Sequence, residues 1–288
     1  MNLLNFEESF IETNGVKLHV VTAGPEDGPL VVLLHGFPEY WKGWKHQIPA
    51  LVEAGYRVMV PDQRGYNTSE KPAKISDYDI DLLAGDILGL IDHAGRDKAH
   101  VVGHDWGAVV AWWLGIHHGD RLNKLAILNV PHPIVMRKHL MKNRSQLKKS
   151  WYIFFFQIPF IPEQAFIRNG GEKMLQMLKA TSNPGSFSEE DLAGQAKSWA
   201  NPGCPRAMIN WYRAMMRRVA SRQEQVRISV PLQMIWGKND IALGSEMAAP
   251  SLDYCDDGQL EMIEEATHWV QHDAPERVNE ILIEFLKD

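Results

Sequence analysis

The chain has 288 residues, of which 45% are hydrophobic and 23% charged, a composition typical of a soluble globular enzyme. Its formal net charge of −6 argues against nucleic acid or an anionic membrane as the main partner. The only two cysteines, Cys204 and Cys255, are too few for a disulfide framework and predict a reducing, cytoplasmic environment. Residues 1–10 do not resemble a signal peptide, and the most apolar window, residues 151–160, is too short to span a membrane.

The first hundred residues predict strands that alternate with helices. Apolar residues flank Asn14-Gly15, a dipeptide that favours a two-residue hairpin turn because both positions tolerate a positive φ. Short apolar runs then indicate buried strands, and apolar residues spaced three or four apart indicate helices. After a hairpin over residues 6–23 we expect a strand at 30–34, a helix at 44–54, a strand at 56–60 and a helix at 77–94.

The central stretch of the chain joins a strand, a sharp turn and a helix. An apolar run at residues 100–102 leads into Gly103-His-Asp-Trp-Gly107, and helical spacing continues to about residue 117. Glycines on both sides of one reactive residue suit a turn that presses a strand against a helix. The pattern G-x-S-x-G does this for the serine nucleophile of α/β-hydrolases, and here Asp105 takes the place of the serine.

The second half of the chain changes its pattern and then returns to it. A strand at 123–129 is followed by residues 134–225, which are rich in aromatic, methionine and basic residues and predict a helical insertion. Its basic residues, from Arg137 to Lys149, are expected to form a solvated helix face. Strands return at 226–236 and 258–263, before a closing helix at 275–286.

This order predicts an α/β-hydrolase fold, with a mostly parallel, doubly wound sheet and an inserted helical cap. The core would comprise residues 1–133 and 226–288, and the cap residues 134–225. In such sheets ligands bind at the carboxyl ends of the strands. Reactive side chains that directly follow predicted strands are therefore the candidates for the site.

Three such side chains are Asp105, Asp240 and His268. Their order along the chain, nucleophile, acid and histidine, is that of α/β-hydrolases, and the converging strand ends can bring them together. His268 would accept a proton from water while Asp240 orients its imidazole ring. Asp105 could instead be a simple turn residue, and His35 and His104 are expected to be structural.

An aspartate nucleophile predicts a different reaction from that of a serine. A carboxylate, with an ordinary pKa of about 3.9, is already ionised at neutral pH and can attack a saturated carbon to form an ester. Water would then hydrolyse that ester through an oxyanion, which requires two donors. The backbone N–H groups of Phe37 and Trp106 stand where this fold places such donors. Direct attack on an ester substrate would give an anhydride, so an alkylating electrophile is expected.

The chain resembles the α/β-hydrolase-fold epoxide hydrolases along nearly its whole length. The matching segments are His35-Gly-Phe-Pro38, Asp62-Gln-Arg-Gly-Tyr66, Gly103-His-Asp-Trp-Gly107, Trp151-Tyr152, Phe156-Gln157, Asn210-Trp-Tyr-Arg213, Trp236-Gly-Lys-Asn-Asp240 and Thr267-His-Trp269. Asn67 departs from the pattern, because many relatives carry glycine there.

This resemblance implies that Tyr152 and Tyr212 donate to the epoxide oxygen and assist its departure, although an aromatic residue in an apolar helix is more often part of a core. The substrate would be a small apolar or aromatic epoxide, converted to a vicinal diol without a metal or organic cofactor. Its pocket would be lined by Phe37, Trp106, Pro131, Phe155, Phe156 and Met215. The protein would act as a monomer or homodimer, with no nucleic-acid or membrane partner.

Two alternatives remain open at this stage. Haloalkane dehalogenases also use an aspartate nucleophile followed by tryptophan, but they often hold the halide with an asparagine where this chain has Phe37. Some chains of this fold have lost catalysis and serve as binding modules, and the complete set of Asp105, Asp240 and His268 counts against that possibility.

Overall fold

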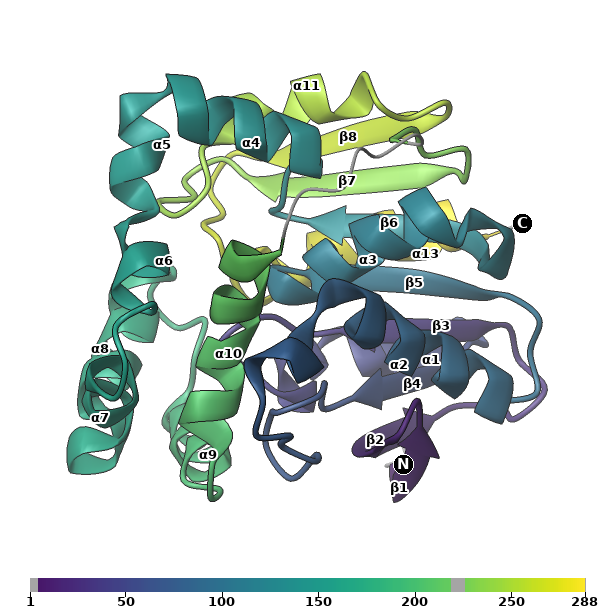
Figure 1. Ribbon diagram of the computed structural model, residues 1–288. Helices are drawn as coiled ribbons and strands as arrows, with labels where there is room; N and C mark the ends of the chain where they lie inside the picture. Colours follow the sequence, from purple (N-terminus) through teal and green to yellow (C-terminus); the bar gives the residue numbers. More distant parts are fainter. Residues whose placement is uncertain (1–4, 219–225, 288) are drawn as a thin grey trace.

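The computed structural model describes residues 5–218 and 226–287. Its strands form one eight-stranded sheet in the order β1-β2-β4-β3-β5-β6-β7-β8 (Figure 1). Strand β2 is antiparallel to both β1 and β4, and the other neighbouring strands are parallel. The strand bounds are β1 Glu7–Thr13, β2 Val16–Ala23, β3 Leu30–Leu34, β4 Arg57–Pro61, β5 Ala99–His104, β6 Leu122–Leu128, β7 Leu232–Gly237 and β8 Gly258–Ile263.

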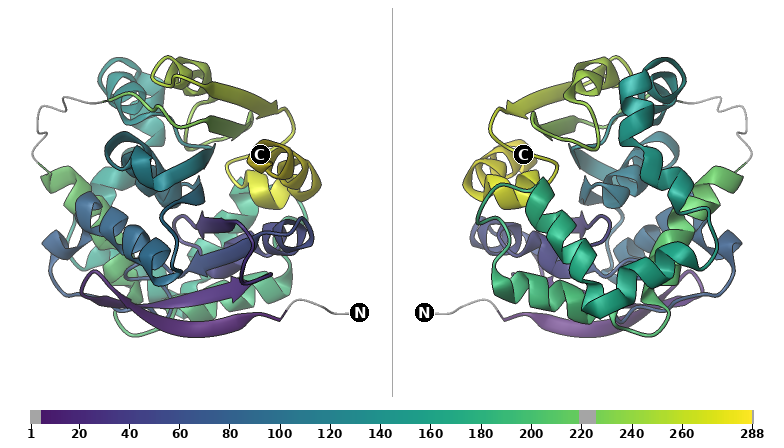
Figure 2. Two further views of the ribbon diagram at one scale, coloured as in Figure 1. Left: turned by 90° about the vertical axis from the view of Figure 1, so that its right-hand side faces the viewer. Right: turned by 90° about the vertical axis from the view of Figure 1, so that its left-hand side faces the viewer.

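The predicted hairpin is confirmed at one edge of this sheet. Thr13 pairs with Val16 across Asn14 and Gly15, whose φ angles are +47° and +76°. Asparagine and glycine adopt such angles more readily than other residues, which explains the two-residue turn. Figure 2 shows this purple hairpin at one edge of the sheet, far from β8 at the opposite edge.

Helices cover both faces of the sheet, as the alternation of strands and helices predicted. In β3, Val32 and Leu34 join a core with α2 and α3, whereas Val31 and Leu33 join a second core with α1 and α13. Successive side chains of a strand point to opposite faces, so a continuous apolar run can supply both cores. The helices outside the insertion are α1 Gln47–Glu53, α2 Ile80–His93, α3 Trp106–His117, α11 Ala248–Leu252, α12 Val270–Asp273 and α13 Pro275–Leu286, with 3₁₀ turns η1 Trp41–Trp44, η2 Ile75–Tyr78, η3 Gly119–Arg121 and η5 Ser245–Met247.

Between β6 and β7 the described residues form helices and no strand. These inserted helices lie beyond the carboxyl ends of the parallel strands (Figure 1). They are α4 Pro133–Lys142, α5 Arg144–Lys149, α6 Trp151–Phe155, α7 Ile161–Ile167, η4 Arg168–Gly171, α8 Glu172–Thr181, α9 Glu189–Trp199 and α10 Cys204–Arg217. The last part of the predicted insertion, residues 219–225, lies outside the described residues.

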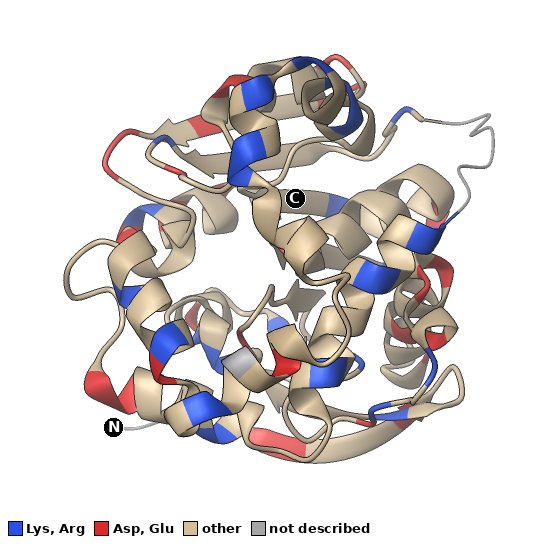
Figure 3. Ribbon diagram, turned by 60° about the vertical axis from the view of Figure 1, so that its left-hand side comes forward, with Lys and Arg blue, Asp and Glu red and all other residues tan. Residues whose placement is uncertain are grey.

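The basic residues from Arg137 to Lys148 lie on a solvated surface, as expected, and Lys149 is half-buried. Arg137, Lys138, Lys142, Arg144 and Lys148 are exposed. Figure 3 shows Lys and Arg positions of the molecule in blue, with α4 and α5 turned toward the viewer. Within the described part of the chain, no helix is long and apolar enough to cross a membrane.

Several predicted elements differ in extent from the observed ones. The helix expected at 77–94 begins at Ile80, after η2, and the helix expected at 44–54 begins at Gln47, after η1, with Pro49 in its first turn, where a missing N–H is tolerated. The strand expected at 226–236 begins only at Leu232, because Pro231 has no N–H for the sheet ladder. Ile228 forms an isolated bridge with Cys255 before that strand.

Candidate active site

Asp105 lies in the sharp turn between β5 and α3, with φ +48° and ψ −119°. The neighbouring glycines allow this turn to approach other backbone segments closely. A Cβ atom on Gly107 would lie 2.0 Å from the Leu34 carbonyl oxygen, and one on Gly36 would lie 2.3 Å from the Asp105 Cβ. An unusual backbone conformation of this kind persists only when surrounding packing enforces it, and it is common at functional sites.

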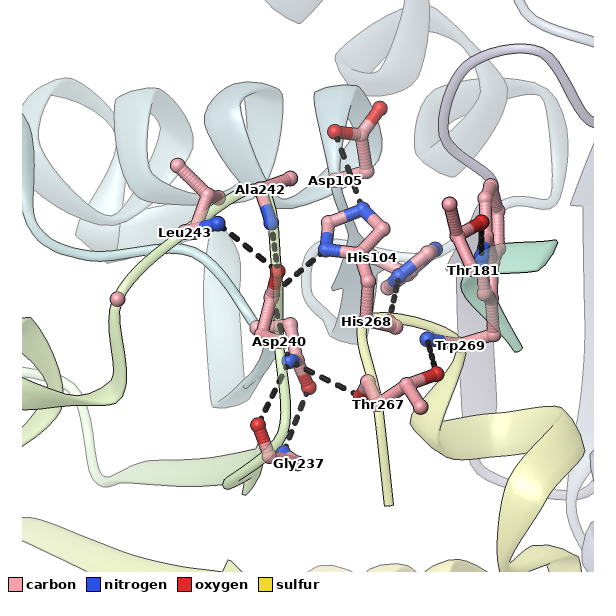
Figure 4. A network of polar contacts seen from close by, with 12 residues as sticks. His104, Asp105, Thr181, Gly237, Asp240, Ala242, Leu243, Thr267, His268 and Trp269 are labelled. Atoms are coloured by element: carbon pink, nitrogen blue, oxygen red, sulfur yellow. Dashed lines mark hydrogen bonds and ion pairs between the residues drawn. The ribbon is translucent and has the colours of Figure 1, made fainter. Parts of the chain in front are cut away.

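His268 lies between the two carboxylates that the sequence singled out (Figure 4). Its Nε2 is 3.5 Å from Asp105 Oδ2, and its Nδ1 is 2.7 Å from Asp240 Oδ2. His268 and Asp240 are buried, with 6% and 4% of their surfaces exposed. The three residues converge on the carboxyl end of the sheet from three separate loops, in the arrangement that a nucleophile, a base and an orienting acid require.

Asp240 is held by donors on both of its oxygens. Oδ1 accepts hydrogen bonds from the backbone N–H groups of Ala242 and Leu243, at 2.7 and 2.8 Å. Oδ2 accepts one from Asn129 Nδ2 at 2.9 Å, in addition to its contact with His268. Sequence reasoning missed Asn129, although its position directly after β6 resembles that of Asp105 after β5.

The charges of this group act on one another strongly because the site is buried. Burial opposes protonation of His268, but the charges and hydrogen bonds of Asp240 and Asp105 raise its pKa to about 10. Burial also opposes ionisation of Asp105, yet His268, His104 and the Phe37 N–H together hold the pKa of Asp105 below its ordinary value. The two groups therefore favour each other's charged forms, an ionised Asp105 and a protonated His268.

The backbone N–H of Phe37 donates a 2.7 Å hydrogen bond to Asp105 Oδ1. Trp106 is the first residue of α3, so its N–H has no acceptor within the helix. His35 supports the turn that carries Phe37, because its Nε2 accepts a hydrogen bond from the N–H of Gln63 and its carbonyl accepts one from the Gln63 side chain. Both proposed oxyanion donors thus lie on segments next to the Asp105 carboxylate.

Tyr152 of α6 and Tyr212 of α10 line the same cavity as Asp105. Their ring centroids lie 5.9 Å apart, and the ring planes are inclined by 84°. Burial and the negative charge of Asp105 raise the pKa of both phenols, so both hydroxyl groups are protonated at neutral pH. The inserted helices therefore bring two phenols, which can act as donors, to the cavity that holds the nucleophile.

This cavity has a volume of about 510 Å³ and mostly apolar walls. Three of the six predicted pocket residues, Trp106, Pro131 and Met215, contribute to the lining. Phe37, Phe155 and Phe156 do not; Phe37 and Phe156 pack against the ring of Tyr212, and Phe155 packs against Phe156. The other apolar lining residues are Val109, Trp112, Val130, Pro133, Met136, Leu140, Met141, Ile153, Met216 and Leu243.

Two further residues noted in the sequence have structural roles in this region. His104 Nε2 donates a 2.8 Å hydrogen bond to the backbone carbonyl of His268. Asn67 has φ +42°, an angle that asparagine tolerates, and its side chain bonds to Asp62 and Asn201. Among the described residues, no group of three or more His, Cys, Asp or Glu side chains is arranged to hold a metal ion.

Comparisons with known proteins agree with this arrangement. Residues 29–275 match the family model described as the alpha/beta hydrolase fold. The chain is 45% identical to AB hydrolase superfamily protein YfhM of Bacillus subtilis, over 97% of each chain. It is 38% identical to Epoxide hydrolase 1 of Caenorhabditis elegans, over 99% of this chain and 71% of the relative, and 34% identical to Epoxide hydrolase A of Mycobacterium tuberculosis, over 97% of each.

Solved structures show the same relationship. A mutant of an epoxide hydrolase from Bacillus megaterium superposes with a TM-score of 0.89 at 30% identity, covering 97% of this chain and 100% of that one. Epoxide Hydrolase A from Mycobacterium thermoresistibile superposes with a TM-score of 0.85 at 32% identity, covering 98% of each chain. The chain therefore belongs to the α/β hydrolase fold family and, within it, to the epoxide hydrolases.

Proposed function

We propose that this protein hydrolyses an epoxide to a vicinal diol through a covalent ester on Asp105. The observation that supports this most directly is that Asp105, which His268 contacts, and two phenols line one apolar cavity. A carboxylate nucleophile suits a saturated electrophilic carbon, and phenol donors suit an oxygen leaving group. Residues 134–225 would act as the cap that supplies the phenols.

In the first step the ionised Asp105 oxygen attacks one epoxide carbon, and the bond from that carbon to the epoxide oxygen breaks. The departing oxygen becomes an alkoxide, which Tyr152 and Tyr212 stabilise by hydrogen bonding. The alkoxide then takes up one proton and becomes a hydroxyl group. That proton comes in the end from the His268 imidazolium, relayed through a phenol or water. The products of this step are a neutral hydroxyalkyl ester and a neutral imidazole, so the charges balance.

The ester prepares the base for the second step. The charge of Asp105 is one of the causes that raise the pKa of His268 in the resting site, and ester formation removes that charge. The pKa of His268 then falls, and the neutral imidazole can accept a proton from water as the water attacks the ester carbonyl carbon. The Asp240 carboxylate, 2.7 Å from Nδ1, stabilises the imidazolium as it forms again.

Hydrolysis of the ester passes through an oxyanion on the former carboxyl oxygen. The Phe37 N–H already bonds to Asp105 Oδ1, and we assign it with the Trp106 N–H as the oxyanion donors. Collapse of this intermediate breaks the bond from the carboxyl carbon to the diol oxygen, which takes the proton of the added hydroxyl group. Asp105 and His268 return to their starting charges, and the diol leaves.

The cavity favours an epoxide that carries an apolar or aromatic substituent. Its walls are mostly aliphatic, aromatic and methionine side chains, and its volume of about 510 Å³ suits a small organic molecule. The charge of Asp105 disfavours anionic groups close to the reacting carbon. A monosubstituted epoxide such as styrene oxide is of this kind.

Haloalkane dehalogenation is the less favoured alternative. Haloalkane dehalogenases often hold the departing halide with a second side-chain N–H donor, besides the tryptophan, at the position where this chain has Phe37, whose side chain offers none. Two phenols, in contrast, suit an epoxide oxygen. The two activities are separable by measuring diol release from styrene oxide and bromide release from a bromoalkane with the same preparation. We expect diol only, and none with Asp105→Ala; bromide release without diol would overturn the proposal.

We also propose a cytoplasmic location. Cys204 and Cys255 are both free thiols and both buried, which suits a reducing compartment. The expectation of a monomer or homodimer stays a prediction, and sedimentation at several protein concentrations would measure it.

A further inference from the structure

The two phenols of the candidate site come from different helices that must be held in register. Tyr152 lies on α6 and Tyr212 on α10, with the segment 156–203 between these helices along the chain. Each hydroxyl must reach the same epoxide oxygen at a distance of about 2.6 to 3.2 Å for both to donate. The relative position of α6 and α10 therefore matters for ring opening.

Arg213, the residue after Tyr212 on α10, bonds to the backbone just after α6. Its Nε donates a 2.9 Å hydrogen bond to the carbonyl of Phe156, and its Nη2 donates a 2.8 Å bond to the carbonyl of Ile158. Phe156 directly follows α6, and its own N–H donates to the carbonyl of Tyr152 at 2.9 Å. Only one residue, Phe156, thus separates the Arg213 guanidinium from the backbone of Tyr152.

A buried carboxylate holds the guanidinium in place. Arg213 Nη1 lies 2.6 Å from Glu163 Oε1 on α7, and the two side chains are only 8% and 14% exposed. Arg213 Nη1 also approaches Asn210 Oδ1 at 3.4 Å, one turn earlier on α10. Gln157 adds a second link, because its Nε2 donates to the carbonyls of Ile153 and Tyr212.

Stability alone does not explain the buried pair of Arg213 and Glu163. Burying a charged pair brings little net stability, because desolvation offsets the attraction between the charges. The planar guanidinium, however, binds two carbonyls and a carboxylate in fixed directions, which a lysine cannot do. We infer that Arg213, held by Glu163, is a positioning residue that sets Tyr152 and Tyr212 at the spacing needed to share one leaving oxygen. This inference rests on the proposed epoxide hydrolase function.

The two half-reactions make the inference testable, because the phenols act in ester formation and not in ester hydrolysis. Single-turnover experiments with excess enzyme and styrene oxide, quenched at intervals, would give both rate constants from the amounts of ester and diol. We expect Arg213→Lys to slow ester formation about tenfold to a hundredfold, since a displacement of 1 Å can cost that much, and to leave ester hydrolysis unchanged. Equal slowing of both steps, or no slowing, would overturn the inference.

A matched control is available on the same helix. Arg218, directly after α10, pairs with Asp79 and Asp81, and among the described residues it forms no hydrogen bond or ion pair with α6 or α7. Arg218→Lys should leave both rate constants at the wild-type values. If it slows ester formation as much as Arg213→Lys does, the effect is a general one of the helix and the inference fails.

A second variant and a double-mutant cycle distinguish a positioning role from a general loss of folding in Arg213→Lys. Glu163→Gln keeps an acceptor for Arg213 but removes the charge, and it should slow ester formation less than Arg213→Lys while leaving ester hydrolysis unchanged. In a Tyr152→Phe background, Arg213→Lys should have a clearly smaller effect than in the wild type, because it acts through that phenol. Full additivity, or no slowing in either variant, would contradict the role.

The result also separates this inference from the proposed function. A wild-type protein that releases no diol from styrene oxide and forms no ester would count against the proposed function itself. An active wild type with an unchanged Arg213→Lys variant would refute only the positioning role.

Discussion

Asn129 Nδ2 donates to Asp240 Oδ2, the same oxygen that lies 2.7 Å from His268 Nδ1. Asn129 Oδ1 in turn accepts a 3.0 Å hydrogen bond from the N–H of Gly237. One buried amide therefore fixes both the carboxylate and the end of the strand that precedes it. This amide directs the Asp240 carboxylate toward the imidazole.

Replacing Asn129 by glycine tests this relationship without straining the backbone, because glycine readily adopts the φ of +54° found there. The variant leaves Asp240 with one donor fewer in a buried site. We expect a loss of about 1 to 3 kcal/mol in the free energy of unfolding, measured with urea, together with slower ester hydrolysis. Asn67→Gly, at another asparagine with positive φ, is the control and should hydrolyse the ester at the wild-type rate.

The phenols should act in ester formation alone. Tyr152→Phe and Tyr212→Phe each remove one donor to the departing oxygen while keeping the ring and its packing. We expect each to lower the rate constant of ester formation by about 10² and to leave ester hydrolysis unchanged, as measured in single-turnover experiments. A tyrosine variant that slowed only the hydrolysis of the ester would show that its phenol has another role.

The two steps should respond to pH in opposite ways. Ester formation needs ionised Asp105 and protonated His268, so its rate should hold at neutral pH and fall as the pH rises through about 10. Ester hydrolysis needs neutral His268, and the pKa of His268 is lower in the ester than in the free enzyme. The rate of ester hydrolysis should therefore increase with pH until the pH passes this lower pKa. Rapid-quench measurements at several pH values would resolve the two profiles, and parallel profiles would contradict the assignment.

The same raised pKa predicts a pH dependence of stability. A group whose pKa is higher in the folded state stabilises that state most fully below its ordinary value, 6.5 for this histidine. This stabilisation is lost as the pH rises through about 10. The difference in urea-unfolding free energy between wild type and His268→Gln should therefore shrink over that interval.

The glycine after the nucleophile should be intolerant of even one methyl group. In Gly107→Ala the new Cβ would meet the Leu34 carbonyl oxygen at 2.0 Å, so the backbone must shift. We expect a destabilisation of about 3 kcal/mol in urea unfolding and loss of diol formation. Gly119→Ala is a suitable comparison, because its nearest neighbour is a side-chain atom at 3.2 Å.

Local sequence patterns were sufficient to predict the sheet, the hairpin and the turn that holds Asp105. These features depend on neighbouring residues: Asn14-Gly15 determines its own turn, and Gly107 lies two positions from the nucleophile. The contact of Asn129 with Asp240 could not be predicted in this way, because it depends on β6 and β7 lying side by side in the sheet. No local pattern marks such a pair.

The lining of the cavity was also predicted only in part. Phe155 and Phe156 lie in the expected segment, but the packing of α6 against α10 turns Phe156 toward Tyr212 rather than into the cavity. Which face of a short helix meets a cavity depends on contacts between distant segments. Arg213 shows the same limit, since its partners Phe156, just after α6, and Glu163, on α7, lie 50 or more positions away.

The most direct test of the account is a single turnover of styrene oxide in water labelled with ¹⁸O, with enzyme in excess. If Asp105 forms the ester and water attacks its carboxyl carbon, mass analysis of the peptide that carries Asp105 will find the label there. The diol from that turnover will then be unlabelled, because its new oxygen comes from the carboxylate. A labelled diol and an unlabelled Asp105 would mean that water attacks the epoxide directly, and would contradict the account.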